Sequence, residues 1–158
     1  MEVSARWAER DDLDILVALA AEAIEELTPH RGGAIWSQLD ARTEPLVDGF
    51  RSTLASEQDA VIVGAIDHTV VGYAALTLRR LHDATWLGDL TDLYVMPGAR
   101  GVGVGEEMME LAVNWCREKD CVGIDSVALP GDRATKNFFE TFGLVARSLR
   151  VHRSLPPR

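Results

Sequence analysis

Glycines join a strand-like run to a helical one in the second half of this chain. The apolar run at residues 85–96 is followed by Gly101, Gly103 and Gly105, and apolar residues then recur with helical spacing from Met108 onward. Glycine tolerates positive φ, so the chain can turn sharply between the two elements with its amides directed outward. A helix N-terminus adds a partial positive charge, and the junction is therefore predicted to bind an anion such as phosphate.

The spacing of these residues argues against two common phosphate-binding motifs. A Walker P-loop requires Gly-Lys-Ser or Gly-Lys-Thr, whereas Val104 follows Gly103 here. A dinucleotide fingerprint that begins at Gly101 requires glycine or alanine at the position that Glu106 occupies. That fingerprint also opens a parallel strand-helix-strand unit, and the segments upstream predict hairpins instead. The glycine junction is therefore predicted to bind a phosphate-containing ligand through neither of these two motifs.

The order of the elements predicts an α+β fold in a single domain, residues 1–158. The pattern βααβββαβαβ combines early antiparallel hairpins with a late crossover, which indicates one mixed, mostly antiparallel sheet with helices on both faces. Residues 28–57 have a weaker pattern and are expected to carry substrate-specific structure, and residues 154–158 are expected to fray. Strands are predicted at residues 3–8, 60–67, 69–81, 85–96, 121–129 and 144–153, and helices at residues 12–28, 44–54, from 103 onward and at 132–142.

Charge and cysteine content restrict the partners. The 158 residues include 16 Lys and Arg against 25 Asp and Glu, a net charge of −9. This balance argues against nucleic acid or an anionic membrane as partner and suits a cationic substrate. Cys116, Cys121 and the scattered histidines lack metal-ligand spacing, so two reduced thiols and no metal site are expected. No signal peptide or membrane-spanning run is found, and a cytoplasmic location is the simplest expectation.

The pattern Arg100-x-x-Gly103-x-Gly105 resembles the Arg/Gln-x-x-Gly-x-Gly/Ala signature of the GCN5-related N-acetyltransferase (GNAT) family. The context agrees with this resemblance. Val70-Val71-Gly72-Tyr73-Ala74-Ala75 is similar to the third strand of that family, and Asp92-Leu93-Tyr94-Val95-x-Pro97 is similar to its fourth. Residues 132–144 resemble its motif B, which ends in an aromatic-x-x-x-Gly-Phe pattern. The likeness covers the chain from about Asp59 onward, and the first sixty residues match in element order alone.

The resemblance implies acetyl-CoA as co-substrate. The amides of residues 100–105 would hold its pyrophosphate, and the pantetheine arm would lie between the splayed fourth and fifth strands. The Val95 amide would face the thioester carbonyl, where a fixed N–H stabilises the oxyanion of the tetrahedral intermediate. The residues expected to contact the cofactor are Tyr94, Val95, Met96, Arg100, Gly101, Val102, Gly103, Val104, Gly105, Asp132 and Phe139.

Two carboxylates are candidates for the general base. An alkylamine with a lysine-like pKa near 10.4 is protonated at neutral pH and must lose a proton before it attacks. Asp89 stands where several family members carry a catalytic glutamate, and Asp92 matches the acidic residue of the Asp-Leu-Tyr-Val strand. Asp89 is favoured, with a bridging water because aspartate is shorter than glutamate. Solvated or ion-paired carboxylates are the alternative interpretation for each.

Four positions depart from the family pattern. Phe139 stands where motif B often carries a tyrosine acid, and a CoA thiol with a pKa near 8.5 can leave without one. Glu106 and Glu107 in the first helical turn repel a pyrophosphate, which predicts weak cofactor affinity unless Arg100, Arg133 or Lys136 offsets them. Asp132 stands where the family often has asparagine.

The resemblance predicts transfer of acetyl from acetyl-CoA to a primary amine by direct attack in a ternary complex, without a covalent enzyme intermediate. The acidic balance favours a polyamine-like small molecule, an aminoglycoside or a basic peptide end as acceptor. A non-catalytic acyl-CoA-binding regulatory module and an interaction domain that uses only the fold are the alternatives. Because family members often pair through strands or helices, a homodimer is expected, with the strand at residues 144–153 as a possible edge.

Overall fold

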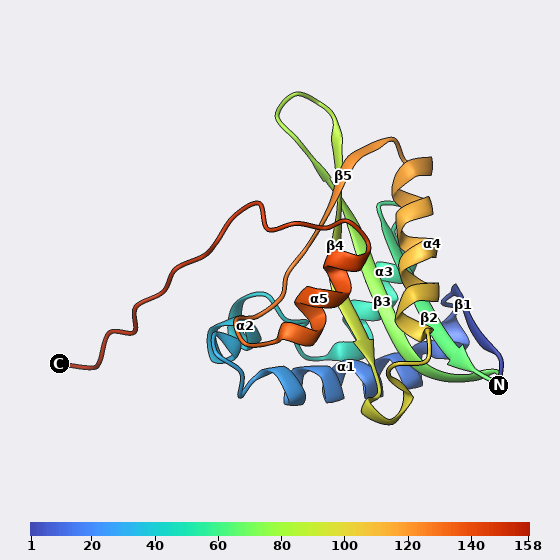
Figure 1. Cartoon of the computed structure of the whole chain (residues 1–158), viewed down its shortest axis with the longest axis horizontal. Helices are drawn as coiled ribbons and strands as arrows, with labels where there is room; N and C mark the ends of the chain where they lie inside the picture. Colours follow the sequence, from blue (N-terminus) through green and yellow to red (C-terminus); the bar gives the residue numbers. More distant parts are fainter.

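A five-stranded mixed sheet forms the centre of the computed structural model, which describes residues 1–158 (Figure 1). The strands follow one another in chain order across the sheet, so each pairs with its neighbour in sequence. The first four are antiparallel, and the last pairs with the fourth in parallel. They are β1 (Val3–Trp7), β2 (Asp59–Ile66), β3 (Thr69–Arg80), β4 (Trp86–Val95) and β5 (Cys121–Ser126).

Helices cover both faces of this sheet. They are α1 (Leu13–Leu27), α2 (Gly33–Leu39), α3 (Leu46–Ala55), α4 (Val104–Glu118) and α5 (Arg133–Thr141). One apolar cluster packs α4 and Phe139 of α5 against one face, and a second packs α1 and α3 against the other. Strand alternation divides the core in this way: Ile62 and Leu76 face α4, whereas Val61, Val63 and Tyr73 face α1 and α3.

Strand β4 contains a β-bulge at Thr91. Leu76 pairs with Leu90 and Ala75 pairs with Asp92, so Thr91 is an extra residue without a partner of its own. A bulge reverses the alternation of the side chains that follow it. Without it, Asp89 and Asp92 would lie on opposite faces of the sheet, because they are three residues apart. With it, both lie on the face covered by α1 and α3.

Strands β4 and β5 separate after a short contact. Their last pair is Leu90 with Ser126, and the Ser126 hydroxyl donates a 2.9 Å hydrogen bond to the Leu90 carbonyl. Strand β4 continues to Val95, but the residues that follow β5 have no strand structure. The β5 side of β4 from Thr91 to Val95 is therefore open.

The predicted fold class, an α+β domain with a mixed sheet between helices, is confirmed. Helix α2 (Gly33–Leu39) was not predicted, because its seven residues follow loop-forming sequence. The strand expected at residues 144–153 is wrong: this segment has no secondary structure, and after the 3.1 Å bond from the Leu144 amide to Phe139 it makes no backbone hydrogen bond. Its alternating pattern is typical of a strand, but a strand needs a neighbour to complete its ladder. None of the helices has both the length and the apolar character needed to cross a membrane.

Candidate active site

The glycine junction between β4 and α4 presents a row of free amides. Gly101 and Gly103 have φ of 79° and 105°, which turn the chain into the helix at Val104. The first helical bond runs from the Glu107 amide to the Gly103 carbonyl at 3.1 Å. The amides from Gly101 to Glu106 donate to no acceptor in the protein. A row of unpaired N–H groups at a helix N-terminus is a site that suits a pyrophosphate.

Arg100 leans away from this row, toward α1. Its Nε donates 2.7 Å to the Val95 carbonyl, and its Nη2 lies 2.8 Å from Glu26. This ion pair raises the pKa of Arg100 above its ordinary value. The guanidinium also lies 5.4 Å from the centre of the Tyr94 ring, whose hydroxyl donates 3.3 Å to Glu22. Two acidic residues of α1 thus hold the end of β4.

The open edge of β4 directs backbone amides into the gap beside β5. The Met96 amide donates 2.8 Å to Val71 on β3, so the neighbouring Val95 amide points to the opposite side. Leu93 has the same direction, because it lies two residues before Val95 without a bulge between them. The direction of the Val95 amide suits the role predicted from the sequence. Leu93 was not among the predicted residues, although its position two residues before Val95 could have indicated it.

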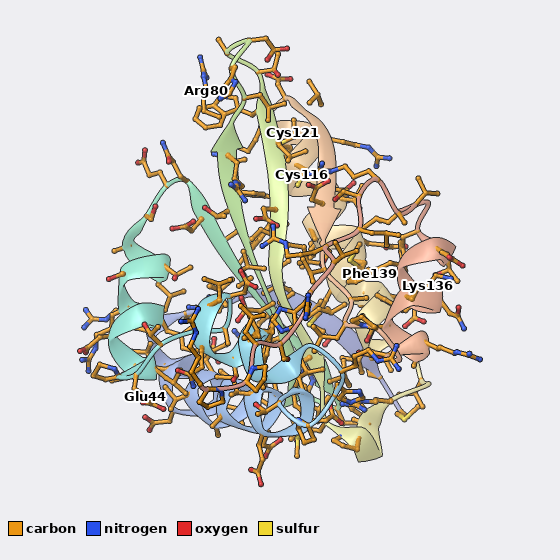
Figure 2. All side chains as sticks on the ribbon, turned by 90° about the vertical axis from the view of Figure 1, so that its left-hand side faces the viewer. Glu44, Arg80, Cys116, Cys121, Lys136 and Phe139 are labelled. Carbon is orange, nitrogen blue, oxygen red and sulfur yellow. The ribbon has the colours of Figure 1, made fainter.

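Helix α5 contributes packing and capping near the glycine junction. Asp132 caps the helix by accepting bonds from the Thr135 amide at 3.3 Å and from its hydroxyl at 2.8 Å. The ring of Phe138 packs so closely that a Cβ on Gly105 would lie 3.1 Å from it. Phe139 is 7% exposed and belongs to the cluster that packs on α4, on the inner side of the helix in Figure 2. The Phe139 ring is therefore part of the apolar core.

Two of the three cations expected to offset Glu106 and Glu107, Arg100 and Lys136, form ion pairs with other residues. Arg100 is paired with Glu26. Lys136, on α5 beside Phe139 in Figure 2, forms an exposed ion pair with Glu140 at 3.1 Å. Neither cation is therefore directed at the first turn of α4.

Asp92 is held in a hydrogen-bond network. Its Oδ2 accepts from Arg42 Nε at 2.7 Å and from the Tyr73 hydroxyl at 2.7 Å, and its Oδ1 accepts from Thr91 at 2.7 Å. Burial, and next the charge of Asp92, raise the pKa of Tyr73 well above its ordinary value, so the phenol remains a donor. Arg42 also lies 4.0 Å over the centre of the Phe50 ring. Both oxygens of Asp92 are therefore in use.

Asp89 is the freer of the two carboxylates. Its side chain is 20% exposed, and its one ion pair, with Arg79, is long at 3.4 Å. It lies beside Asp125 of β5, whose carboxylate is bound by Arg147. Burial raises the pKa of Asp89, and Arg79 opposes part of this effect. A carboxyl group with a raised pKa, partly open to solvent, can accept a proton at neutral pH.

A polar cavity of about 230 Å³ lies on the same face of the sheet. The end of α2, the connection between α2 and α3, helix α3 and strands β2, β3 and β4 line it. Thr77, which pairs directly with Asp89, is part of its wall, so Asp89 lies next to this space. Its lining residues are Asp40, Arg42, Thr53, Asp59, Leu76, Thr77, Thr91 and Asp92.

Comparison with known proteins decides the family. The model of the "Acetyltransferase (GNAT) family" matches residues 20–144, most of the chain. This protein belongs to the GNAT family. The family match and the N-acetyltransferases among its relatives identify the protein as an N-acetyltransferase. This result favours the enzyme over the two alternatives, a non-catalytic acyl-CoA-binding module and an interaction domain.

Three similar proteins agree with this GNAT assignment. An N-acetyltransferase of Archaeoglobus fulgidus is 27% identical over 117 residues, 73% of this chain and 74% of the relative. The aminoglycoside N(6')-acetyltransferase type 1 of Stenotrophomonas maltophilia is 30% identical over 65% of this chain and 72% of its own. The structure of AAC(6')-Iy with the bisubstrate analog CoA-S-monomethyl-acetylneamine has a TM-score of 0.77 at 15% identity, with 99% of this chain and 100% of that chain covered.

Proposed function

We propose that this GNAT enzyme transfers the acetyl group of acetyl-CoA to a primary amine of a small cationic acceptor. The observation that carries the proposal is the row of unpaired amides from Gly101 to Glu106, which lies directly beside the open edge of β4. A pyrophosphate on these amides leaves the pantetheine arm to follow the gap between β4 and β5. The complex of AAC(6')-Iy with a CoA-based analog supports acetyl-CoA as the donor.

Asp89 is proposed as the general base. Asp89 takes the amine proton through a water molecule. The nitrogen lone pair attacks the thioester carbon, so that a C–N bond forms, and the C–S bond then breaks to leave the amide product. The CoA thiolate leaves without a tyrosine acid and takes up a proton afterwards. Asp92 is the weaker candidate, because Arg42, Tyr73 and Thr91 already occupy its oxygens.

The reach of Asp89 favours the Leu93 amide for the oxyanion. At a rise of about 3.3 Å per residue, Leu93 lies about 13 Å along β4 from Asp89 and Val95 about 20 Å. An amine and one water can bridge the shorter separation more readily, and the bulge at Thr91 shortens it further. We therefore propose that the thioester carbonyl faces Leu93, with the Val95 amide further along the same edge.

The acceptor is proposed to occupy the polar cavity beside Asp89. Asp40 and Asp59 line it together with three threonine hydroxyls, which suits an amine-bearing, hydroxyl-bonding molecule. The net charge of −9 attracts such a cation over a longer range. The name of the aminoglycoside-acetylating relative supports the same class of acceptor.

The first experiment is a calorimetric titration with acetyl-CoA of the wild type and two variants at Val102. Val102 is an exposed, non-glycine residue within the row of amides, so a substitution there avoids the strain of positive φ. Val102→Glu places a negative charge at the row and should weaken binding at least tenfold, whereas Val102→Gln should retain it. Equal binding by both variants would show that the phosphates bind elsewhere.

The second experiment tests the base with a panel of polyamines and aminoglycosides, followed through CoA release. The wild type should acetylate at least one of them, and Asp89→Asn should remove the acid limb of the pH–rate profile. If Asp89→Asn keeps that profile while Asp92→Asn loses it, the roles are reversed.

A further inference from the structure

Two carboxylates lie side by side where β4 and β5 are still paired. Asp89 of β4 and Asp125 of β5 are direct partners in the parallel ladder, so their side chains leave the same face of the sheet. Neighbouring strands are about 4.8 Å apart, so two negative charges meet here at close range. Both carboxylates can therefore compete for a proton that arrives at this position.

Each carboxylate has an arginine of its own, but the contacts of the two arginines differ. The Nε of Arg147 lies 2.9 Å from both oxygens of Asp125, and its Nη2 lies against Oδ2. Arg79 contacts Asp89 through one nitrogen at 3.4 Å. A guanidinium that engages a carboxylate with two nitrogens binds it more firmly than a single long contact does. Both oxygens of Asp125 are therefore occupied, and Asp89 remains available.

The charge state of Asp89 responds to both members of the Asp125–Arg147 pair. Burial raises the pKa of Asp89 and Arg79 lowers it; beyond these effects, the charge of Asp125 raises the pKa and the charge of Arg147 lowers it. The intact pair therefore places little net charge beside Asp89. The remaining charged residues on this face line the polar cavity, and none forms an ion pair with Asp89: Asp40, Arg42, Asp59 and Asp92.

Arg147 belongs to the segment that follows α5. Beyond residue 147 no hydrogen bond or ion pair joins this segment to the rest of the protein, and its red end leaves the domain in Figure 1. The Arg147 side chain is 68% exposed, and all of its hydrogen bonds go to Asp125. An exposed arginine that is bound to one carboxylate acts on its surroundings through its charge rather than through packing.

We propose that Asp125 and Arg147 are positioning residues for the general base: their ion pair keeps Asp125 from competing for the amine proton, so that Asp89 alone accepts it. This inference rests on the proposed role of Asp89. Without Arg147, the charge of Asp125 would stand unpaired beside Asp89, which would then hold its proton more tightly and be ionised less at a given pH. Without the charge of Asp125, Asp89 would be ionised more readily.

The first test is the pH dependence of kcat/KM for an amine that the wild type acetylates. Arg147→Gln should move the acid limb to higher pH and lower kcat/KM on that limb about two- to threefold, a modest factor because salt screens an exposed cation. Asp125→Asn should move the limb to lower pH, and the double variant should return it close to the wild type. A merely structural role would not give opposite shifts that cancel.

Two control variants isolate the charge of Arg147. Arg147→Lys keeps the positive charge and should restore most of the wild-type profile. Arg51→Gln breaks an exposed ion pair with Asp48 on α3 and should leave the profile unchanged. A profile that moves as far in Arg147→Lys as in Arg147→Gln would overturn the role of the charge.

Carboxyl NMR of the protein with ¹³C-labelled aspartate measures the same coupling without turnover. The Asp89 signal, assigned by its loss in Asp89→Asn, should titrate at higher pH in Arg147→Gln and at lower pH in Asp125→Asn. An Asp89 titration that is unchanged in both variants, or that moves in the same direction in both, would overturn the inference.

The kinetics of Asp89→Asn separate this inference from the proposed function. If Asp89→Asn keeps the wild-type pH–rate profile, Asp89 is not the base, and the proposed function fails at that point. If Asp89→Asn loses the acid limb while Arg147→Gln and Asp125→Asn leave the limb in place, the base stands and only the role of the ion pair is overturned.

Discussion

Arg42 and Asp92 form an ion pair that is largely withdrawn from water, and removing its cation should destabilise the protein. Arg42 Nε lies 2.7 Å from Asp92, and the two side chains are 16% and 12% exposed. Removing one member of a buried pair costs about 3–5 kcal/mol, because an unpaired charge stays behind. The Tyr73 and Thr91 hydroxyls still donate to the carboxylate, so we expect Arg42→Met to cost about 3 kcal/mol, the lower end of that range.

A double-mutant cycle separates the ion pair from the other contacts of Arg42. Its guanidinium stacks over Phe50, a contact that is worth about 1 kcal/mol. In an Asp92→Asn background, Arg42→Met should therefore cost only about 1 kcal/mol, which leaves a coupling of about 2 kcal/mol between Arg42 and Asp92.

The assay is urea unfolding of the four proteins of the cycle at neutral pH, followed by circular dichroism. In thermal unfolding of the same proteins, 3 kcal/mol corresponds to a fall in Tm of roughly 6–12 °C for a domain of this size. Arg51→Met is the control, because its pair with Asp48 is exposed and should be worth less than about 0.5 kcal/mol. A measured coupling below about 0.5 kcal/mol would refute the reasoning, since the buried pair would then behave as a surface pair.

Three further substitutions test other parts of the structure. Burial raises the pKa of Asp89 in the folded state, so its ionised form destabilises the folded protein. Asp89→Asn should therefore stabilise the protein, by an amount that grows as the pH rises from the unfolded-state pKa to the folded-state pKa. An effect of the substitution that is equal above and below that range in urea unfolding would contradict this. Gly64→Ala would place a Cβ 2.5 Å from the Val104 side chain in the first turn of α4. It should lower the free energy of unfolding by about 2 kcal/mol and weaken acetyl-CoA binding. An unchanged urea midpoint would argue against this close contact. Glu26→Gln releases Arg100 from a half-exposed pair and should tighten acetyl-CoA binding about two- to fivefold in calorimetry, and looser binding would show that the pair positions Arg100 for the cofactor.

Local patterns in the sequence were sufficient to predict the fold class. The glycines that adopt positive φ, the alternation of β2 and β3 and the apolar stripes of α1 and α4 all depend on near neighbours in the chain. The hairpin of β2 and β3 and the crossover through α4 follow from the order of these elements. The glycine junction was predicted in the same way, because a strand, a turn with positive φ and a helix N-terminus follow one another directly.

The roles of the two carboxylates could not be read from the sequence. Asp89 and Asp92 share one face only because of the bulge at Thr91, and the bulge is a property of how β4 pairs with β3. Arg42 binds the Asp92 carboxylate although it lies 50 residues earlier in the chain. It belongs to the segment between α2 and α3, whose sequence has no strong local pattern. Which carboxylate remains available as a base therefore depends on contacts between distant segments.

The segment at residues 144–153 shows the same division. Its alternating sequence predicts a strand, because alternation is a local property of the side chains. Tertiary structure alone decided that the segment joins no sheet, because a ladder of hydrogen bonds requires a second strand at the right place. The sequence thus determined the α+β elements and the anion-binding junction, whereas the packing of distant segments decided the bulge, the buried ion pair and the open edges of β4 and β5.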